Sequence, residues 1–184
     1  MKLKNTVLSA MFISIGLLLP FLTGQIQQIG NMLLPMHIPV LLCGLICGPL
    51  YGFFVGFILP ILRSFVFEMP QLYPQAIAMA FELATYGLII GFLYRYFPKQ
   101  NLKYLYLSMI ISMISGRIVW GLAEVVLLSF INTPFTFYAF ISGSLLTAVP
   151  GIILQLIIIP TIMIALRKSK LFSVSKMSKQ INVK

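Results

Sequence analysis

The sequence predicts an all-α, polytopic membrane protein with six transmembrane helices in a single domain covering residues 1–184. Hydrophobic residues make up 60% of the chain and charged residues only 9%, a composition outside the range of soluble globular domains. The apolar residues are grouped into long segments, and a membrane-spanning helix needs roughly 20 such residues. A chain of 184 residues therefore has room for about six spans.

Turn-forming residues mark the ends of these segments, for example Gly48-Pro49 after the second and Pro70 after the third. The second segment is too short to cross the hydrocarbon directly, so we expect part of it to be re-entrant or shielded by protein. We expect Pro150 and Pro160 to kink the last helix. The expected helices span about 5–23, 36–48, 51–68, 76–97, 104–131 and 137–166, followed by a basic tail at 167–184.

The basic residues indicate the orientation. All 13 Lys and Arg except Arg63 and Arg117 fall at the termini or near the loop after the fourth helix. The loops on the other side, about 24–35, 69–75 and 132–136, contain none. By the positive-inside rule, both termini are then cytoplasmic. The net charge is +10. We interpret the Lys and Arg residues behind it as determinants of membrane orientation that lie beside anionic lipid headgroups, and we expect no nucleic-acid partner.

A small set of polar side chains lies within or at the edge of the apolar segments, in the outer half of the expected bundle. Charged groups are costly in hydrocarbon and persist mainly where they face the bundle interior, a partner charge or a polar ligand. Arginine can bind a carboxylate, glutamate accepts from hydroxyls and amides, and Trp or Tyr covers apolar carbons. These properties suit a site for a small polar solute. The candidates are His37, Arg63, Glu68, Glu82, Tyr86, Arg117, Trp120 and Glu124.

Spacing supports the grouping of these residues. Arg117, Trp120 and Glu124 stand at i, i+3 and i+7 on one helix face, and Glu82 and Tyr86 stand at i and i+4.

The same charges could instead neutralise one another and hold helices together. The available pairs are Arg63 with Glu68 or Glu82, and Arg117 with Glu82 or Glu124. His37 could equally cap the second helix or bond to a backbone carbonyl.

Motifs for catalysis are missing. Cys43 and Cys47 are expected to be packing residues, because a thiol oxidoreductase would need C-x-x-C or an accessible cysteine. The single His and the absence of Asp exclude a His-cluster metal site and Asp-based metal sites. No P-loop occurs, so the chain lacks that means of hydrolysing ATP. We expect no catalytic residue, no metal and no cofactor.

Ala10 and Ser14 form a small-x-x-x-small pair in the first helix. Small residues at this spacing let another helix approach closely. The approaching helix could belong to a partner or to the same bundle.

The chain resembles the substrate-binding S components of energy-coupling factor (ECF) vitamin transporters over nearly its whole length. The most specific segments are HIPVLLCG at 37–44, GPLYG at 48–52 and MAFELATYG at 79–87, together with Gly56, Met69-Pro70 and Pro74.

The resemblance implies a multi-pass subunit of the bacterial plasma membrane that binds a small water-soluble vitamin or precursor near the extracellular face. It would work with a membrane coupling subunit and two ATP-binding subunits, and not as an enzyme. The loop at about 24–35 would act as a lid, with Asn31 among its polar residues. Ala10 and Ser14 match the family's Ala-x-x-x-Ala-like docking motif, with Ser as a departure at the second position. The pattern also looks like that of members associated with pantothenate, which is the best guess for the substrate; folate, niacin, cobalamin and a queuosine precursor are the alternatives.

Two other functional classes remain open from the sequence. An intramembrane enzyme acting on a lipid or isoprenoid phosphate could use Glu as a base and Arg to bind phosphate. A self-contained secondary transporter usually contains inverted repeats, and we find no repeat in the sequence.

Overall fold

The computed structural model describes residues 2–23, 32–98, 101–131 and 148–168, and all structural statements concern these residues. They form helices and turns without a strand, so the all-helical prediction is confirmed. The elements are α1 (Lys2–Leu18), the 3-10 helix η1 (Leu19–Thr23), α3 (His37–Ile46), α4 (Pro49–Phe67), the π-helical turn η2 (Leu72–Ala76), α5 (Ile77–Tyr96), α6 (Leu102–Ser129) and α8 (Val149–Lys168).

Within the described residues, five helical stretches are long and apolar enough to cross a membrane, and α3 is a shorter apolar helix. The 10 residues of α3 span only about 15 Å. The side chains from His37 to Leu45 are all buried, and α3 contacts α1, α4, α5 and α8. The expectation that protein shields the short second helix is therefore confirmed.

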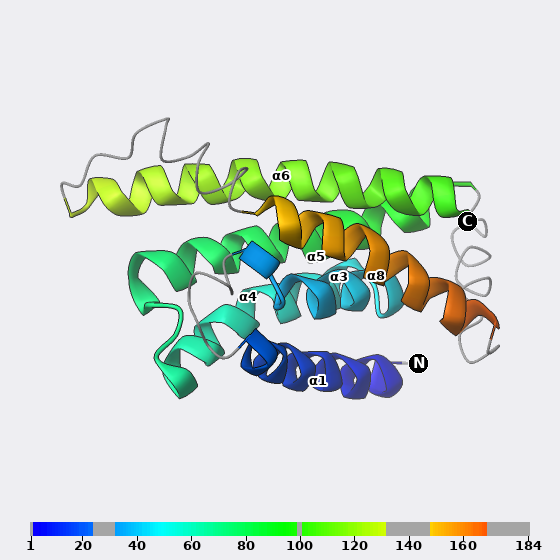
Figure 1. Ribbon diagram of the computed structural model, residues 1–184, viewed down its shortest axis with the longest axis horizontal. Coiled ribbons are helices and arrows are strands. Elements are labelled where there is room, and N and C mark those ends of the chain that lie inside the picture. Colours follow the sequence, from blue (N-terminus) through cyan, green and yellow to red (C-terminus); the bar gives the residue numbers. More distant parts are fainter. Residues whose placement is uncertain (1, 24–31, 99–100, 132–147, 169–184) are drawn as a thin grey trace.

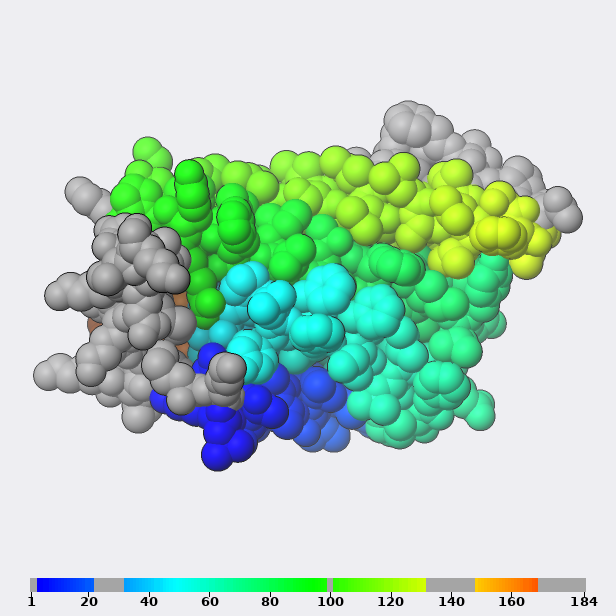
Figure 2. Space-filling model, turned by 180° about the vertical axis from the view of Figure 1, so that it is seen from behind, coloured from blue at the N-terminus to red at the C-terminus, as the bar shows by residue number. Residues whose placement is uncertain are grey.

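The long helices are arranged around this buried centre. Figure 1 shows α1 and α6 on opposite sides of the molecule, with α3, α4 and α5 between them and α8 crossing α3 on the face toward the viewer. Helix α5 packs against α3, α4 and α6. From behind, the segment around the α3–α4 turn fills the surface between α1 and α5 (Figure 2).

Glycines allow α3, α4 and α5 to pack backbone against backbone. A Cβ built on Gly44 would lie 2.5 Å from the carbonyl oxygen of Gly87, and one built on Gly52 would lie 2.6 Å from the same atom. A Cβ on Gly87 would overlap the backbone of Gly52. Any larger residue at these positions would push the three helices apart, so the glycines set the spacing between α3 and α5.

The turn between α3 and α4 follows the pattern expected from its sequence. Gly48 has φ of 116°, a value that side-chain-bearing residues rarely adopt. Pro49 follows as the first residue of α4, where its missing N–H needs no partner.

Most of the basic residues lie at one end of the bundle. Helices α1 and α6 begin at this end, and α5 and α8 finish there (the right-hand end in Figure 1). The Asn5 side chain donates to the carbonyl oxygen of Cys47 at 3.2 Å, and Arg167 donates to the Tyr94 hydroxyl. The N-in, C-in orientation itself stays a prediction from the positive-inside rule. The basic residues at this end are Lys2, Lys4, Arg95, Lys103, Arg167 and Lys168.

The expected sixth helix is described only in part. Residues 137–147, and the tail from 169, lie outside the described residues. Helix α8 begins at Val149, which places Pro150 in its first turn, a position that tolerates proline, while Pro160 lies inside the helix.

We predict that Gly87→Val destabilises the fold, because the added side chain would overlap the backbone of α4. Overpacking of this kind costs about 1–3 kcal/mol. The measurement is thermal unfolding of the detergent-purified protein. Leu88→Val is the control, since the neighbouring Leu88 side chain is exposed. Equal unfolding midpoints for both variants would contradict the proposed backbone contact.

Candidate functional site

A buried polar cluster lies where α3, α5 and α6 meet, with Glu82 at its centre. Oε1 of Glu82 lies 3.0 Å from Arg117 Nη1 and accepts a hydrogen bond from the Tyr86 hydroxyl at 3.1 Å. The Nε2 atom of His37 lies 3.6 Å from the same oxygen. Glu82, Tyr86 and His37 are buried, and Arg117 is 11% exposed. One carboxylate oxygen thus contacts side chains from three helices.

Local sequence explains how the cluster assembles. Glu82 and Tyr86 are one turn apart on α5, so they share a face. The Tyr86 ring packs directly on Gly116 of α6, where a Cβ would overlap the ring. The ring also lies 5.2 Å from the His37 ring, measured between centroids. Gly116 therefore leaves room for an aromatic ring between α5 and α6, while the next residue, Arg117, carries the counter-charge for Glu82.

Several nitrogen atoms in the buried interior have no hydrogen-bond partner within the described part of the chain. They are Nδ1 and Nε2 of His37, Nε and Nη2 of Arg117, Nη2 of Arg95 and Nε2 of Gln155. A buried donor without an acceptor costs about 1–3 kcal/mol, and such groups in native proteins require an explanation, such as a bound molecule or water. Arg95 belongs to the basic end, His37 and Arg117 belong to the Glu82 cluster, and Gln155 lies on the buried face of α8. The Glu82–Arg117 ion pair links α5 to α6, but it leaves Nε and Nη2 of Arg117 without an acceptor.

Gln155 is a candidate that the sequence reasoning missed. It lies on the buried face of α8 and is 1% exposed. It is the single Gln, Asn or charged residue between Val149 and Leu166. This isolated amide in an otherwise apolar segment is the signal that could have identified it.

Two further residues of α6 lie on the same side as Arg117. Glu124 is buried and lies within electrostatic range of Glu82. Trp120 is half-buried. Of the three α6 candidates, Glu124 is buried, Arg117 and Trp120 are partly buried, and Arg117 pairs with Glu82 and not with Glu124.

Arg63 lies apart from this cluster. Its Nη1 atom donates to the carbonyl oxygen of Leu17 at 2.8 Å, and its guanidinium carbon lies 5.7 Å and 5.3 Å from the ring centroids of Phe21 and Phe67. The contacts hold α4 against the end of α1. The alternative pairing of Arg63 with Glu68 or Glu82 is not found among the described residues.

The position of Glu68 explains part of this difference. Residues five apart on a helix do not share a face, and Glu68 ends α4 with a left-handed backbone, φ 57°. Its side chain is exposed. Glu68 therefore lies outside the buried cluster.

The docking candidates Ala10 and Ser14 are exposed on α1. The Ser14 hydroxyl donates to the carbonyl oxygen of Ala10 at 3.1 Å, so its hydrogen bond is made within the helix. Ser9 and Phe12 are the buried residues on this stretch of α1. The small pair therefore does not pack α1 against its own bundle in the described part of the chain.

Asn31 and most of the expected lid lie outside the described residues. Cys43 and Cys47 are both free and buried. No group of three or more His, Cys, Asp or Glu side chains that could hold a metal ion occurs in the described ranges.

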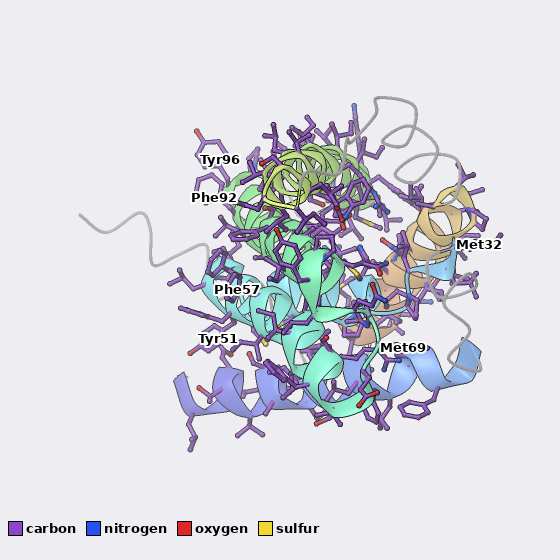
Figure 3. All side chains as sticks on the ribbon, turned by 90° about the vertical axis from the view of Figure 1, so that its left-hand side faces the viewer. Met32, Tyr51, Phe57, Met69, Phe92 and Tyr96 are labelled. Carbon is purple, nitrogen blue, oxygen red and sulfur yellow. The ribbon has the colours of Figure 1, made fainter. Side chains whose placement is uncertain are left out.

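Figure 3 shows the distribution of polar and apolar atoms seen along the bundle from the end opposite the basic residues. Apolar side chains cover the outside, and Phe92 and Tyr96, for example, point away from the helices. Nitrogen and oxygen atoms gather between the helices. The candidate site is therefore a polar interior within an apolar shell.

We predict that Arg117→Leu lowers the stability of the ligand-free protein by about 3–5 kcal/mol, because Glu82 would be left buried without its counter-charge. The double variant Glu82→Gln/Arg117→Leu should recover part of this loss, since no charge then stays unpaired. The measurement is a double-mutant cycle by thermal or denaturant unfolding. Strictly additive effects of the two substitutions would contradict direct pairing.

Comparison with known proteins gives one match. A family model described as ECF transporter, substrate-specific component, matches residues 4–163, which is more than half of the chain and includes the whole Glu82 cluster. No curated protein and no solved structure matches the chain.

Proposed function

The chain belongs to the family of ECF transporter substrate-specific components, and on this premise we propose that it captures a small water-soluble vitamin or vitamin precursor at the outer side of a bacterial plasma membrane. The buried Glu82 cluster with its unused donors is the observation that carries the proposal. As a transporter subunit, the chain would rely on a membrane coupling subunit and two ATP-binding subunits for energy.

The depth of the cluster supports uptake from outside. Glu82 lies five residues after the start of α5, about 7.5 Å along the helix axis, at the end of the bundle opposite the basic residues. If the basic end is cytoplasmic, as the positive-inside rule predicts, the cluster lies in the outer half of the membrane. A solute could then enter it from the extracellular side.

Pantothenate is our best candidate for the substrate. It carries a carboxylate, an amide and hydroxyl groups. The carboxylate suits the free Nε and Nη2 atoms of Arg117, and Glu124 can accept hydrogen bonds from hydroxyl or amide groups. The half-buried Trp120 lies between these two residues on α6 and can cover apolar carbons. The sequence pattern of the resemblance favours the same vitamin.

We predict that the detergent-purified protein retains one small vitamin in stoichiometric amount, identified by mass spectrometry of released small molecules against an empty-vector control. Arg117→Leu should lose this ligand, because removing the partner of a buried ligand charge costs about 2 kcal/mol or more. Arg63→Leu should retain it, since Arg63 contacts Leu17 and two phenylalanine rings instead of the cluster.

The identity of the retained molecule decides between functional classes. Pantothenate would support the full proposal, and another vitamin would support binding while correcting the substrate. A stoichiometric phospholipid or isoprenoid phosphate would instead favour an intramembrane enzyme.

Ala10 and Ser14 are our proposed docking positions for the coupling subunit. Both are exposed, both are small, and the Ser14 hydroxyl is already bonded within the helix. A partner helix can therefore approach this stretch of α1 closely without leaving a polar group unpaired.

We predict that Ala10→Leu/Ser14→Leu abolishes vitamin uptake by cells while leaving vitamin binding by the purified chain unchanged, because only the close approach of a partner helix is blocked. Met11→Leu is the control, since this neighbouring side chain is exposed and already large. Uptake and co-purification with the coupling subunit are the two measurements. Normal uptake by the double variant would contradict docking at these positions.

A further inference from the structure

Gln155 is the one strongly buried amide in α8, and nothing in the described part of the chain accepts a hydrogen bond from its Nε2 atom. The side chain is 1% exposed. A glutamine is among the least favourable residues to bury without a partner, because its amide loses its bonds to water. An unpaired buried amide inside a membrane bundle calls for an explanation, such as a bound molecule or water.

The packing of α8 on α3 places Gln155 at the level of His37. One turn before Gln155, a Cβ built on Gly151 would meet the backbone of Leu33. After Gln155, Ile158 lines an apolar groove together with Ile38. Both pairs of positions advance in the same direction along α3 and α8. Gln155 lies between them on α8, and this level is beside the first turn of α3, which His37 begins.

At this level of the bundle, Gln155 lies on a fourth helix, α8, beside the helix that carries His37. The unused groups there include Nε2 of Gln155, two nitrogens of Arg117 and the ring nitrogens of His37. Arg117 and the Gln155 amide nitrogen can only donate. Donors without a partner can be satisfied by a ligand oxygen that accepts hydrogen bonds, such as a carboxylate oxygen or an amide carbonyl oxygen.

We propose that Gln155 is a substrate-binding residue whose amide N–H donates to a carboxylate or carbonyl oxygen of the bound molecule, which also accepts from the free N–H groups of Arg117. The inference rests on the proposed binding function and deepens it. Glu82 then acts as a positioning residue, since its Oε1 atom already faces Arg117, Tyr86 and His37. The substrate class is a small molecule that presents an acceptor oxygen between α6 and α8.

The test compares the wild type with Gln155→Met, Gln155→Glu and the control Ser108→Ala. Met has a similar length to Gln but no amide. Glu replaces the donor with an acceptor that would repel the ligand oxygen. Ser108 is a fully buried polar residue of α6, but its hydroxyl is already bonded to the Tyr104 carbonyl oxygen at 2.8 Å. Binding of pantothenate, nicotinate, folate and cobalamin is measured by isothermal titration on the purified proteins.

We expect the bound probe to lose about 10-fold in affinity in Gln155→Met, the scale of one hydrogen bond to a charged group, and more in Gln155→Glu. Ser108→Ala should bind as the wild type does. Unfolding of each variant is measured in parallel, and Gln155→Met alone decides the result if Gln155→Glu does not fold.

Two results would overturn the inference while leaving the proposed function intact. One is an unchanged dissociation constant in Gln155→Met, and the other is tighter binding by Gln155→Glu, which would indicate a ligand donor at this position. If the wild type neither retains a vitamin on purification nor binds any of the probes, the proposed function fails, and the inference falls with it. Pantothenol, which has a hydroxyl in place of the carboxylate, should bind more weakly than pantothenate to the wild type.

Discussion

The burial of the Glu82 carboxylate is the constraint on which the rest of the structure depends. A charged carboxylate inside an apolar bundle is very unfavourable unless it is paired and hydrogen-bonded. Arg117 supplies the charge and Tyr86 supplies a hydrogen bond, which requires α5 and α6 to be in contact at this level. His37 brings the start of α3 to the same oxygen. The position of one side chain thereby determines how three helices are aligned.

Close packing of backbones makes this alignment possible. Gly44, Gly52 and Gly87 let α3, α4 and α5 touch, and Gly116 makes room for the Tyr86 ring. In a bilayer, helices gain little from burying apolar surface against each other, so association depends on such close contact and on polar groups. The charged cluster and the glycines therefore support each other: small residues bring the helices together, and the buried pair fixes their register.

The sequence was sufficient to predict the helical class, the shielded second helix and the inward face of α6. These features depend only on the length of an apolar segment and on the spacing of residues within one helix, and both can be read from a single stretch of sequence. It could not choose among the ion pairs, since spacing within a helix does not tell which helices are neighbours. Arg63 was predicted to bind substrate, with pairing to a glutamate as the alternative, but the aromatic rings of Phe21 and Phe67 and the Leu17 carbonyl lie around it. Gln155 was missed because a single amide in an apolar run shows its importance only once its burial is known.

The burial of α3 has a consequence for the environment in which the protein works. A lipid bilayer of changing thickness acts on helices that touch it, by tilting them or by thinning around them. Helix α3 is surrounded by α1, α4, α5 and α8, so its position is set by protein contacts alone. His37, at the head of this helix, is thus held by protein contacts. Glu82 and Arg117 lie on α5 and α6, whose outer faces carry exposed apolar side chains, so a change in bilayer thickness acts on these two helices and not directly on α3.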